Sequence, residues 1–112
     1  MKTTLLFLFV FLSVTLFGQN VYIPDANFKA YLVANSTINT NGDTEIQVSE
    51  AISYEGSISI VPGYNISDLT GLETFSSLTE LHTGGTQLTS LDVSQNIDLE
   101  VIDCLGCQLT SL

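Results

Sequence analysis

A 21-residue repeat near the carboxyl end limits what this chain can fold into. When Leu78–Leu91 is moved forward by 21 positions it lies on Leu99–Leu112, and seven of the fourteen paired residues are identical. Leu81 pairs with Ile102, so a branched apolar side chain is kept at that position too. Apolar residues at fixed offsets within such a period are typical of a solenoid, in which each unit stacks on the one before it.

Each unit reads L-x-x-L-x-T/C-x-x-T/C-x-L, which predicts a short strand followed by a turn. The period lies in the range of leucine-rich repeats. Because side chains alternate along a strand, we expect Leu81 and Thr83 to point inward, with Ile102 and Cys104 below them. The same alternation predicts an exposed face that carries Glu80, His82, Gly84, Val101, Asp103 and Leu105.

Residues 58–77 read as an irregular first repeat. Ile58 and Ile60 alternate with serines, as in a strand, and Pro62-Gly63 marks a turn. Apolar residues then recur every three positions, which suits a loosely helical return limb; they are Ile66, Leu69, Leu72 and Phe75. We expect the spacing of this unit to differ by one residue from that of the 21-residue repeat, near Pro62. Residues 56–112 would then hold about two and a half repeats, truncated at the carboxyl end with apolar core exposed.

The first 19 residues have the features of a secretory signal peptide. Lys2 supplies a positive start, and Leu5–Phe17 is apolar apart from two hydroxyl residues. That run is too short to cross a hydrocarbon core of about 30 Å. We predict cleavage after Gln19, no membrane insertion afterwards, and a secreted or cell-surface location.

Charge excludes several kinds of partner. After loss of the leader, Lys29 is the only lysine or arginine against 12 acidic residues, so the net charge is near −11. Binding to nucleic acid requires clustered basic residues, which this chain lacks. Docking on anionic lipid is disfavoured for the same reason.

Residues 20–55 are predicted to form a helical segment of their own. Asp25 is a good N-cap for a helix that ends at Asn35-Ser36-Thr37. Phe28, Tyr31 and Leu32 lie on one face of it at helical spacing. A second helix is expected to begin near Ser49.

The loop between these helices partly fits the template of a calcium-binding loop. Its oxygen-bearing residues at the template's ligand positions are Asn39, Asn41, Asp43, Glu45 and Glu50. Position 1 is Asn rather than Asp, and position 6 is Thr44 where the sharp turn requires Gly. The sequence therefore leaves open whether the loop binds calcium or is a metal-free helix–loop–helix; no other cofactor is expected.

Three motifs resemble those of secreted bacterial leucine-rich-repeat proteins of the internalin-like kind. They are I-P-D-A-N-F from Ile23, I-S-D-L-T-G-L-E from Ile66 and L-T-S-L-D-V-S from Leu88. The resemblance implies an α+β fold in which a helical cap, similar to a degenerate EF-hand, precedes a short solenoid with a small parallel sheet. It also implies recognition of a protein or glycan through the concave strand face, without catalysis. The repeat's ninth position, usually Asn in this family, is here Thr86 and Cys107.

Two groups of residues could carry chemistry. His82 and Asp103 should lie side by side on neighbouring strands and could form half of a catalytic triad. We expect no serine or cysteine nucleophile on that face, so the chain is predicted not to be an enzyme. The binding patch would consist of Glu80, His82, Val101, Asp103 and Leu105. Cys104 and Cys107 are predicted to fill the core as small apolar residues, with a local disulfide as the alternative.

Overall fold

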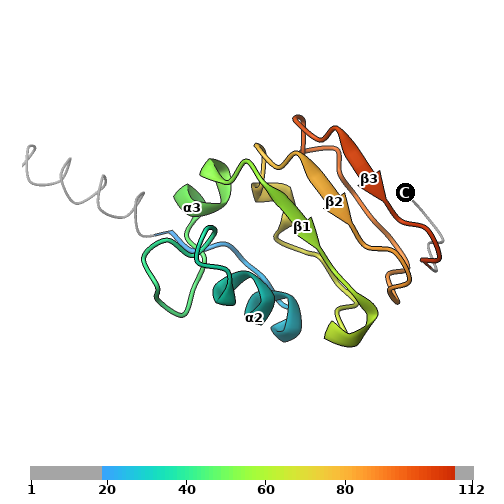
Figure 1. Ribbon diagram of the computed structural model, residues 1–112. Coiled ribbons are helices and arrows are strands. Elements are labelled where there is room, and N and C mark those ends of the chain that lie inside the picture. The colour runs from blue at the N-terminus through green and yellow to red at the C-terminus, as the bar shows by residue number, and fades with distance from the viewer. Residues whose placement is uncertain (1–18, 108–112) are drawn as a thin grey trace, which may run out of the picture.

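The computed structural model describes residues 19–107, which form a small α+β unit (Figure 1). The predicted leader therefore lies outside the described residues, apart from Gln19. Within 19–107 no helix is long and apolar enough to cross a membrane. In chain order the elements are α2 (Ala26–Ala34), α3 (Val48–Ser53), β1 (Ser57–Ser59), the 3-10 turns η1 (Pro62–Tyr64) and η2 (Leu72–Thr74), β2 (Glu80–His82) and β3 (Val101–Asp103).

Helix α2 forms where the sequence predicts it. The side chain of Asp25 accepts hydrogen bonds from the backbone of Asn27 and Phe28, and Asn35 is the C-cap. Phe28 and Leu32 are fully buried, and burying each side chain contributes about 1.5–3 kcal/mol. Helical spacing places both side chains on the same face, so one side of this short helix joins the core.

Helix α3 also forms, and its first residue is Val48. The side chain of Glu50 accepts a hydrogen bond from the backbone of Gln47 at 3.0 Å as part of a capping box. The segment before it pairs with the start of the described chain, because Val48 N donates to Gln19 O and Val21 N donates to Ile46 O. These bonds attach the first described residues to the loop between the helices.

The three strands form one parallel sheet in the order β1-β2-β3 (Figure 1). Leu81 pairs with Ile102, so the 21-residue offset of the sequence is the register of β2 against β3. Ile58 pairs with Leu81, an offset of 23. The first unit is therefore two residues longer than the second, and the prediction of a one-residue shift was wrong. The turn η1 lies within this longer unit.

Each of the last two strands is followed by a turn that requires a glycine. Gly85 and Gly106 have φ angles of 75° and 79°, in the left-handed region that side chains with a Cβ avoid. They occupy equivalent positions of the 21-residue repeat. Gly85 N also donates to Leu105 O at 2.9 Å, which continues the strand pairing into the turn.

The core lies under the sheet and along the return limbs. The apolar residues spaced every three positions are all buried, as the sequence predicts, and η2 forms within that limb. They pack in one cluster with the inward residues of the strands and with the helices. Its members from the repeat region are Ile58, Ile60, Ile66, Leu69, Leu72, Phe75, Leu78, Leu81, Leu88 and Leu91.

Inward burial ends at β3. Leu81 and Thr83 are fully buried, as predicted. Ile102 shares the inward side of the sheet with Leu81 but is 46% exposed, and Cys104 is only partly buried. The prediction that Ile102 would be a core residue is thus not met, whereas Cys104 packs against the core without being fully buried. The reason is position, because β3 has a neighbouring strand on one side only.

Candidate functional site

The outward face of the sheet carries two rows of side chains, one residue from each strand. The register aligns Ser57 with Glu80 and Val101 in one row, and Ser59 with His82 and Asp103 in the other. The intervening Ile58 and Leu81 are fully buried, so these row residues point away from the core. Four of the five residues predicted for the binding patch therefore share one face: Glu80, His82, Val101 and Asp103.

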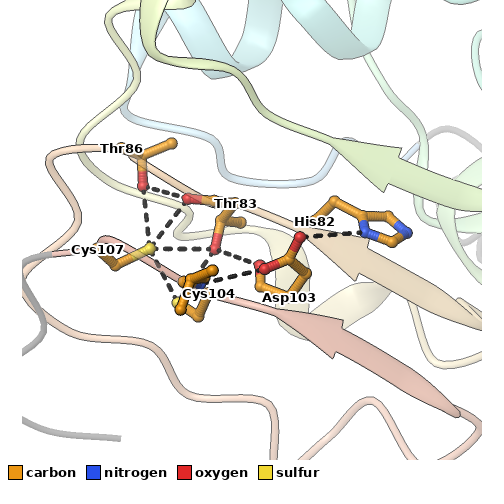
Figure 2. A network of polar contacts seen from close by, with 7 residues as sticks. His82, Thr83, Thr86, Asp103, Cys104 and Cys107 are labelled. Atoms are coloured by element: carbon orange, nitrogen blue, oxygen red, sulfur yellow. Dashed lines mark hydrogen bonds and ion pairs between the residues drawn. The ribbon is translucent and has the colours of Figure 1, made fainter.

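The predicted His–Asp pair forms. His82 Nδ1 lies 4.0 Å from Asp103 Oδ2, and the two side chains are 36% and 53% exposed (Figure 2). That separation is longer than a hydrogen bond, so the contact is a loose pair. An exposed ion pair of this kind contributes about 0–1 kcal/mol to stability.

The expectation that no serine lies on this face was wrong. Ser59 is exposed and stands in register with His82, on the side opposite to Asp103. A serine, a histidine and an aspartate therefore form one row across the three strands. The row was missed because the 21-residue period does not apply to β1, whose register has an offset of 23. The alternation of serines with Ile58 and Ile60 was the available signal.

The fifth predicted patch residue lies beyond the strands. Leu105 is 86% exposed in the turn after β3, and its backbone N–H donates to Asp103 Oδ1 at 3.1 Å. Gly84 likewise follows β2 rather than belonging to it. The strands each contain three residues, so the patch continues from the sheet into the turns at its end.

A cluster of hydroxyl and thiol groups lies next to this row (Figure 2). Thr83 and Thr86 are buried, and Thr86 Oγ1 donates to Thr83 O at 2.8 Å. Cys104 and Cys107 are free thiols in the structure, with Sγ atoms 3.0 Å apart. Cys107 Sγ donates to Thr83 O at 2.9 Å. Thr86 and Cys107, at the ninth position of the repeat, thus both donate to Thr83 O, although neither has the amide group of an asparagine.

The two thiols differ in acidity. Burial raises the pKa of Cys104, and its donation to Cys107 raises that pKa further. Burial acts in the same direction on Cys107, but hydrogen bonds from Cys104, Thr86 and Thr83 outweigh it and lower the pKa of Cys107. Cys107 is therefore the more readily ionised thiol of the pair.

The residues of the predicted calcium loop are bonded to one another. Asp43 Oδ1 accepts from Glu45 N, and its Oδ2 accepts from the amides of Asn41 and Gln47. Buried Glu50 accepts from Gln47 N, from Asn41 N and from Thr40 Oγ1. The carboxylates that would supply most of a calcium site's affinity thus already bind donors of the loop.

The other candidate ligands of the loop, Glu45 and Asn39, differ in their contacts. Glu45 forms an ion pair with Lys29 at 2.7 Å. Asn39 is 5% exposed and donates to Val33 O and Asp43 O. Its Oδ1 has no hydrogen-bond partner in the described part of the chain, so this oxygen does not count against a metal site. Within residues 19–107 no three acidic, histidine or cysteine side chains gather as metal ligands.

Comparisons with known proteins give fold similarity alone. No family model matches the sequence, and neither does any curated protein. The structure is similar to that of the CBM51-2 domain, in complex with GlcNAc, and INT domains of Clostridium perfringens ZmpB, with a TM-score of 0.58 and 22% identity over 76% of this chain. A structure of the same domains described without GlcNAc gives 0.56, with 23% identity over 77%. The chain spans 17% of the length of either neighbour.

Proposed function

We propose that this chain is an exported recognition module of the leucine-rich-repeat, internalin-like kind, which binds a protein or a glycan without catalysing a reaction. The observation that carries the proposal is the Ser59–His82–Asp103 row. It presents a hydroxyl, an imidazole and a carboxylate side by side on an exposed face. Exposed polar side chains held by a rigid sheet are typical of binding sites.

Three observations support the repeat architecture. The strands are parallel and follow one another at offsets of 23 and 21 residues. Equivalent glycines with left-handed φ follow β2 and β3. Helices α2 and α3 lie toward β1, at the opposite edge of the sheet from β3 (Figure 1). A helical cap on the first repeat would shield the end of its apolar core from water.

The absence of catalysis is part of the proposal. A working triad needs the serine and the histidine within about 2.6–3.2 Å of each other and an aspartate that orients the ring. His82 Nδ1 is 4.0 Å from Asp103 Oδ2. The Ser59 backbone N–H donates to Tyr31 Oη at 3.0 Å, so it is not available to an oxyanion. The row fits ligand binding better than acyl transfer.

The class of ligand follows from the chemistry of the face. It combines hydrogen-bonding groups with apolar Val101 and Leu105, which are 41% and 86% exposed. Such a mixture suits a protein surface or a sugar. The neighbouring structure contains a carbohydrate-binding domain in complex with GlcNAc, which favours including glycans in the search.

The test compares variants of the 112-residue chain on a glycan array and against a panel of purified extracellular proteins. His82→Ala combined with Asp103→Ala should weaken binding to any captured ligand by about tenfold or more. Asp98→Ala serves as the control, because Asp98 is exposed but lies outside the strands. Equal binding by wild type and the double variant would show that the binding site does not include His82 and Asp103. Covalent labelling of Ser59 by a fluorophosphonate would overturn the proposal that the row is not catalytic.

An alternative function is a structural one, as an N-terminal segment of a larger surface protein. The observation that favours it is that the fold matches only 17% of the neighbour's chain. In that case the sheet face binds no ligand by itself. The array and the protein panel distinguish the two, since a structural segment would give no binding that depends on His82 or Asp103.

A further inference from the structure

A groove lies between helix α2 and turn η1, and its lining residues do not include Ser59, His82 or Asp103. Its volume is about 640 Å³, within the range of sites for small organic ligands. Figure 1 shows α2 beside η1 at the β1 edge of the sheet. Small residues from both elements leave the space open, and they are Ala30, Ala34 and Gly63.

Two tyrosines from different elements form the aromatic part of the groove. The rings of Tyr31 and Tyr64 have centroids 5.5 Å apart and planes inclined by 49°. Tyr31 is held in place, because its hydroxyl accepts a hydrogen bond from Ser59 N of β1 at 3.0 Å. Tyr64 is 47% exposed. One ring is therefore anchored to the sheet, while the other remains available to a ligand.

Apart from the tyrosine hydroxyls, the polar side chains of the groove are asparagine amides. Asn27 Nδ2 donates to Asn65 O at 3.0 Å, which joins α2 to the residue after η1. Asn35 Oδ1 accepts from Thr37, so the Nδ2 group of Asn35 keeps its donors free within the described part of the chain. Among residues 19–107, no acidic, basic or histidine side chain lines the groove. The site therefore offers neutral donors and acceptors beside aromatic surface.

We propose that this groove binds a neutral pyranose ring of a glycan, as a second site independent of the strand face. A pyranose has an apolar C–H face that packs on an aromatic ring, and hydroxyl groups around its edge that bond amides. Anionic ligands are disfavoured, because the chain has a net charge of −10 and the groove contains no cation. A fully apolar ligand would leave the Nδ2 donors of Asn35 unused.

The chain provides its own spectroscopic signal for the test. It has four tyrosines and no tryptophan, so intrinsic fluorescence comes from tyrosine, and two of the four line the groove. The probes are three neutral oligosaccharide series, built from glucose, mannose and N-acetylglucosamine. Titration of the full chain should show saturable binding of at least one series, and a sialylated oligosaccharide should bind about tenfold more weakly.

Matched tyrosine variants locate the site. Tyr64→Ala should weaken oligosaccharide binding by about tenfold or more, whereas Tyr64→Phe, which keeps the ring, should stay within about threefold. Tyr22→Ala is the control, because Tyr22 is 75% exposed and lies outside the groove. Tyr64 is on the surface, so its replacement should leave the fold intact, as circular dichroism would confirm.

The outcomes separate this proposal from the one for the strand face. Oligosaccharide binding that is lost in Tyr64→Ala but retained in the double variant His82→Ala with Asp103→Ala would support the groove as the binding site. This conclusion would not depend on whether the strand face binds a ligand of its own. The reverse pattern would overturn the groove while leaving the strand face intact. The groove proposal would also be overturned if no neutral series bound. Binding of tetramethylammonium, a cation that packs on aromatic rings, in place of the sugars would overturn it as well.

Discussion

The carboxylate of Asp25 accepts a hydrogen bond from the backbone N–H of Ser67, 42 residues further along the chain, at 3.1 Å. The same oxygen accepts from Asp68 N, while the other oxygen caps α2 by accepting from Asn27 N and Phe28 N. One side chain therefore joins the first described helix to the return limb of the repeat region. This relationship leads to the first prediction.

Replacing Asp25 with Ala should lower the free energy of unfolding at pH 7 by about 1–2 kcal/mol, the usual cost of losing an N-cap, or somewhat more because two further N–H groups lose their acceptor. Denaturant unfolding measures the change. Asp92→Ala is the control, because Asp92 is exposed and accepts hydrogen bonds only from nearby Ser94. An equal loss in both variants would contradict the prediction, because the bonds of Asp25 to α2 and to the return limb would then contribute no more than those of a local turn.

The same carboxylate predicts a dependence on pH. Partial burial raises the pKa of Asp25, but the four backbone donors outweigh it and hold the pKa below its ordinary value of 3.8. A depressed pKa stabilises the folded state above the unfolded pKa, and this contribution is lost as pH falls through the folded pKa. Wild type should therefore lose more stability than Asp25→Asn between about pH 5 and pH 2. Parallel pH curves for the two proteins would contradict the prediction.

Gly71 should tolerate no side chain. Its φ of 109° lies in the left-handed region, and an added Cβ would come within 2.8 Å of Ile23 Cγ1 and 3.0 Å of Tyr22 O. Gly42 has a φ of 72° with nothing within 4 Å of an added Cβ. Gly42→Ala should cost about 1 kcal/mol from backbone strain alone, and Gly71→Ala about 2–4 kcal/mol because packing is disturbed as well. Thermal unfolding of both variants gives the comparison, and similar melting temperatures would refute it.

Asn96 should be important for stability although it is not a candidate binding residue. It is 4% exposed, and its Nδ2 donates to Leu72 O at 2.9 Å and Phe75 O at 3.0 Å. Each carbonyl keeps one other bond from the backbone. Asn96→Ala should therefore cost about 1–3 kcal/mol, against about 0.5 kcal/mol or less for the exposed neighbour in Gln95→Ala. Urea unfolding checks both values.

The two thiols should react at different rates. The pKa of Cys107 is lowered and that of Cys104 is raised, and the thiolate is the reactive form. Iodoacetamide at pH 7 to 8 should therefore modify Cys107 first, as peptide mass spectrometry would show, and the difference in rate should shrink as pH rises. Faster labelling of Cys104 would mean that the hydrogen bonds to Cys107 do not govern its acidity. A chain isolated without reactive thiols would indicate the disulfide that the sequence left open.

Calcium should leave the melting temperature unchanged. Asp43 and Glu50 already accept hydrogen bonds from donors of their own loop, so a cation would have to displace those bonds. The measurement is a thermal scan with millimolar calcium and with a chelator. A rise in melting temperature that Asp43→Ala with Glu50→Ala abolishes would show that the loop is a metal site after all.

Local patterns in the sequence determined several elements of this protein. Asp25 caps α2, and Phe28 with Leu32 faces the core, because capping and helical spacing act between residues a few positions apart. The register of Leu81 on Ile102 also follows from the sequence, since two nearly equal units place equivalent residues side by side. For the same reason His82 could be placed next to Asp103 in advance.

Only the tertiary structure decided what stands on the other side of His82. Ser59 lies there because the first unit, which contains η1, is two residues longer than the second, and a register depends on the whole path of the connection rather than on the strand itself. The groove between Tyr31 and Tyr64 likewise depends on how α2 packs against that turn. Contacts between distant segments determine both, because the alternation of serines with Ile58 and Ile60 indicates only which face Ser59 is on and not which residue of β2 it lies beside.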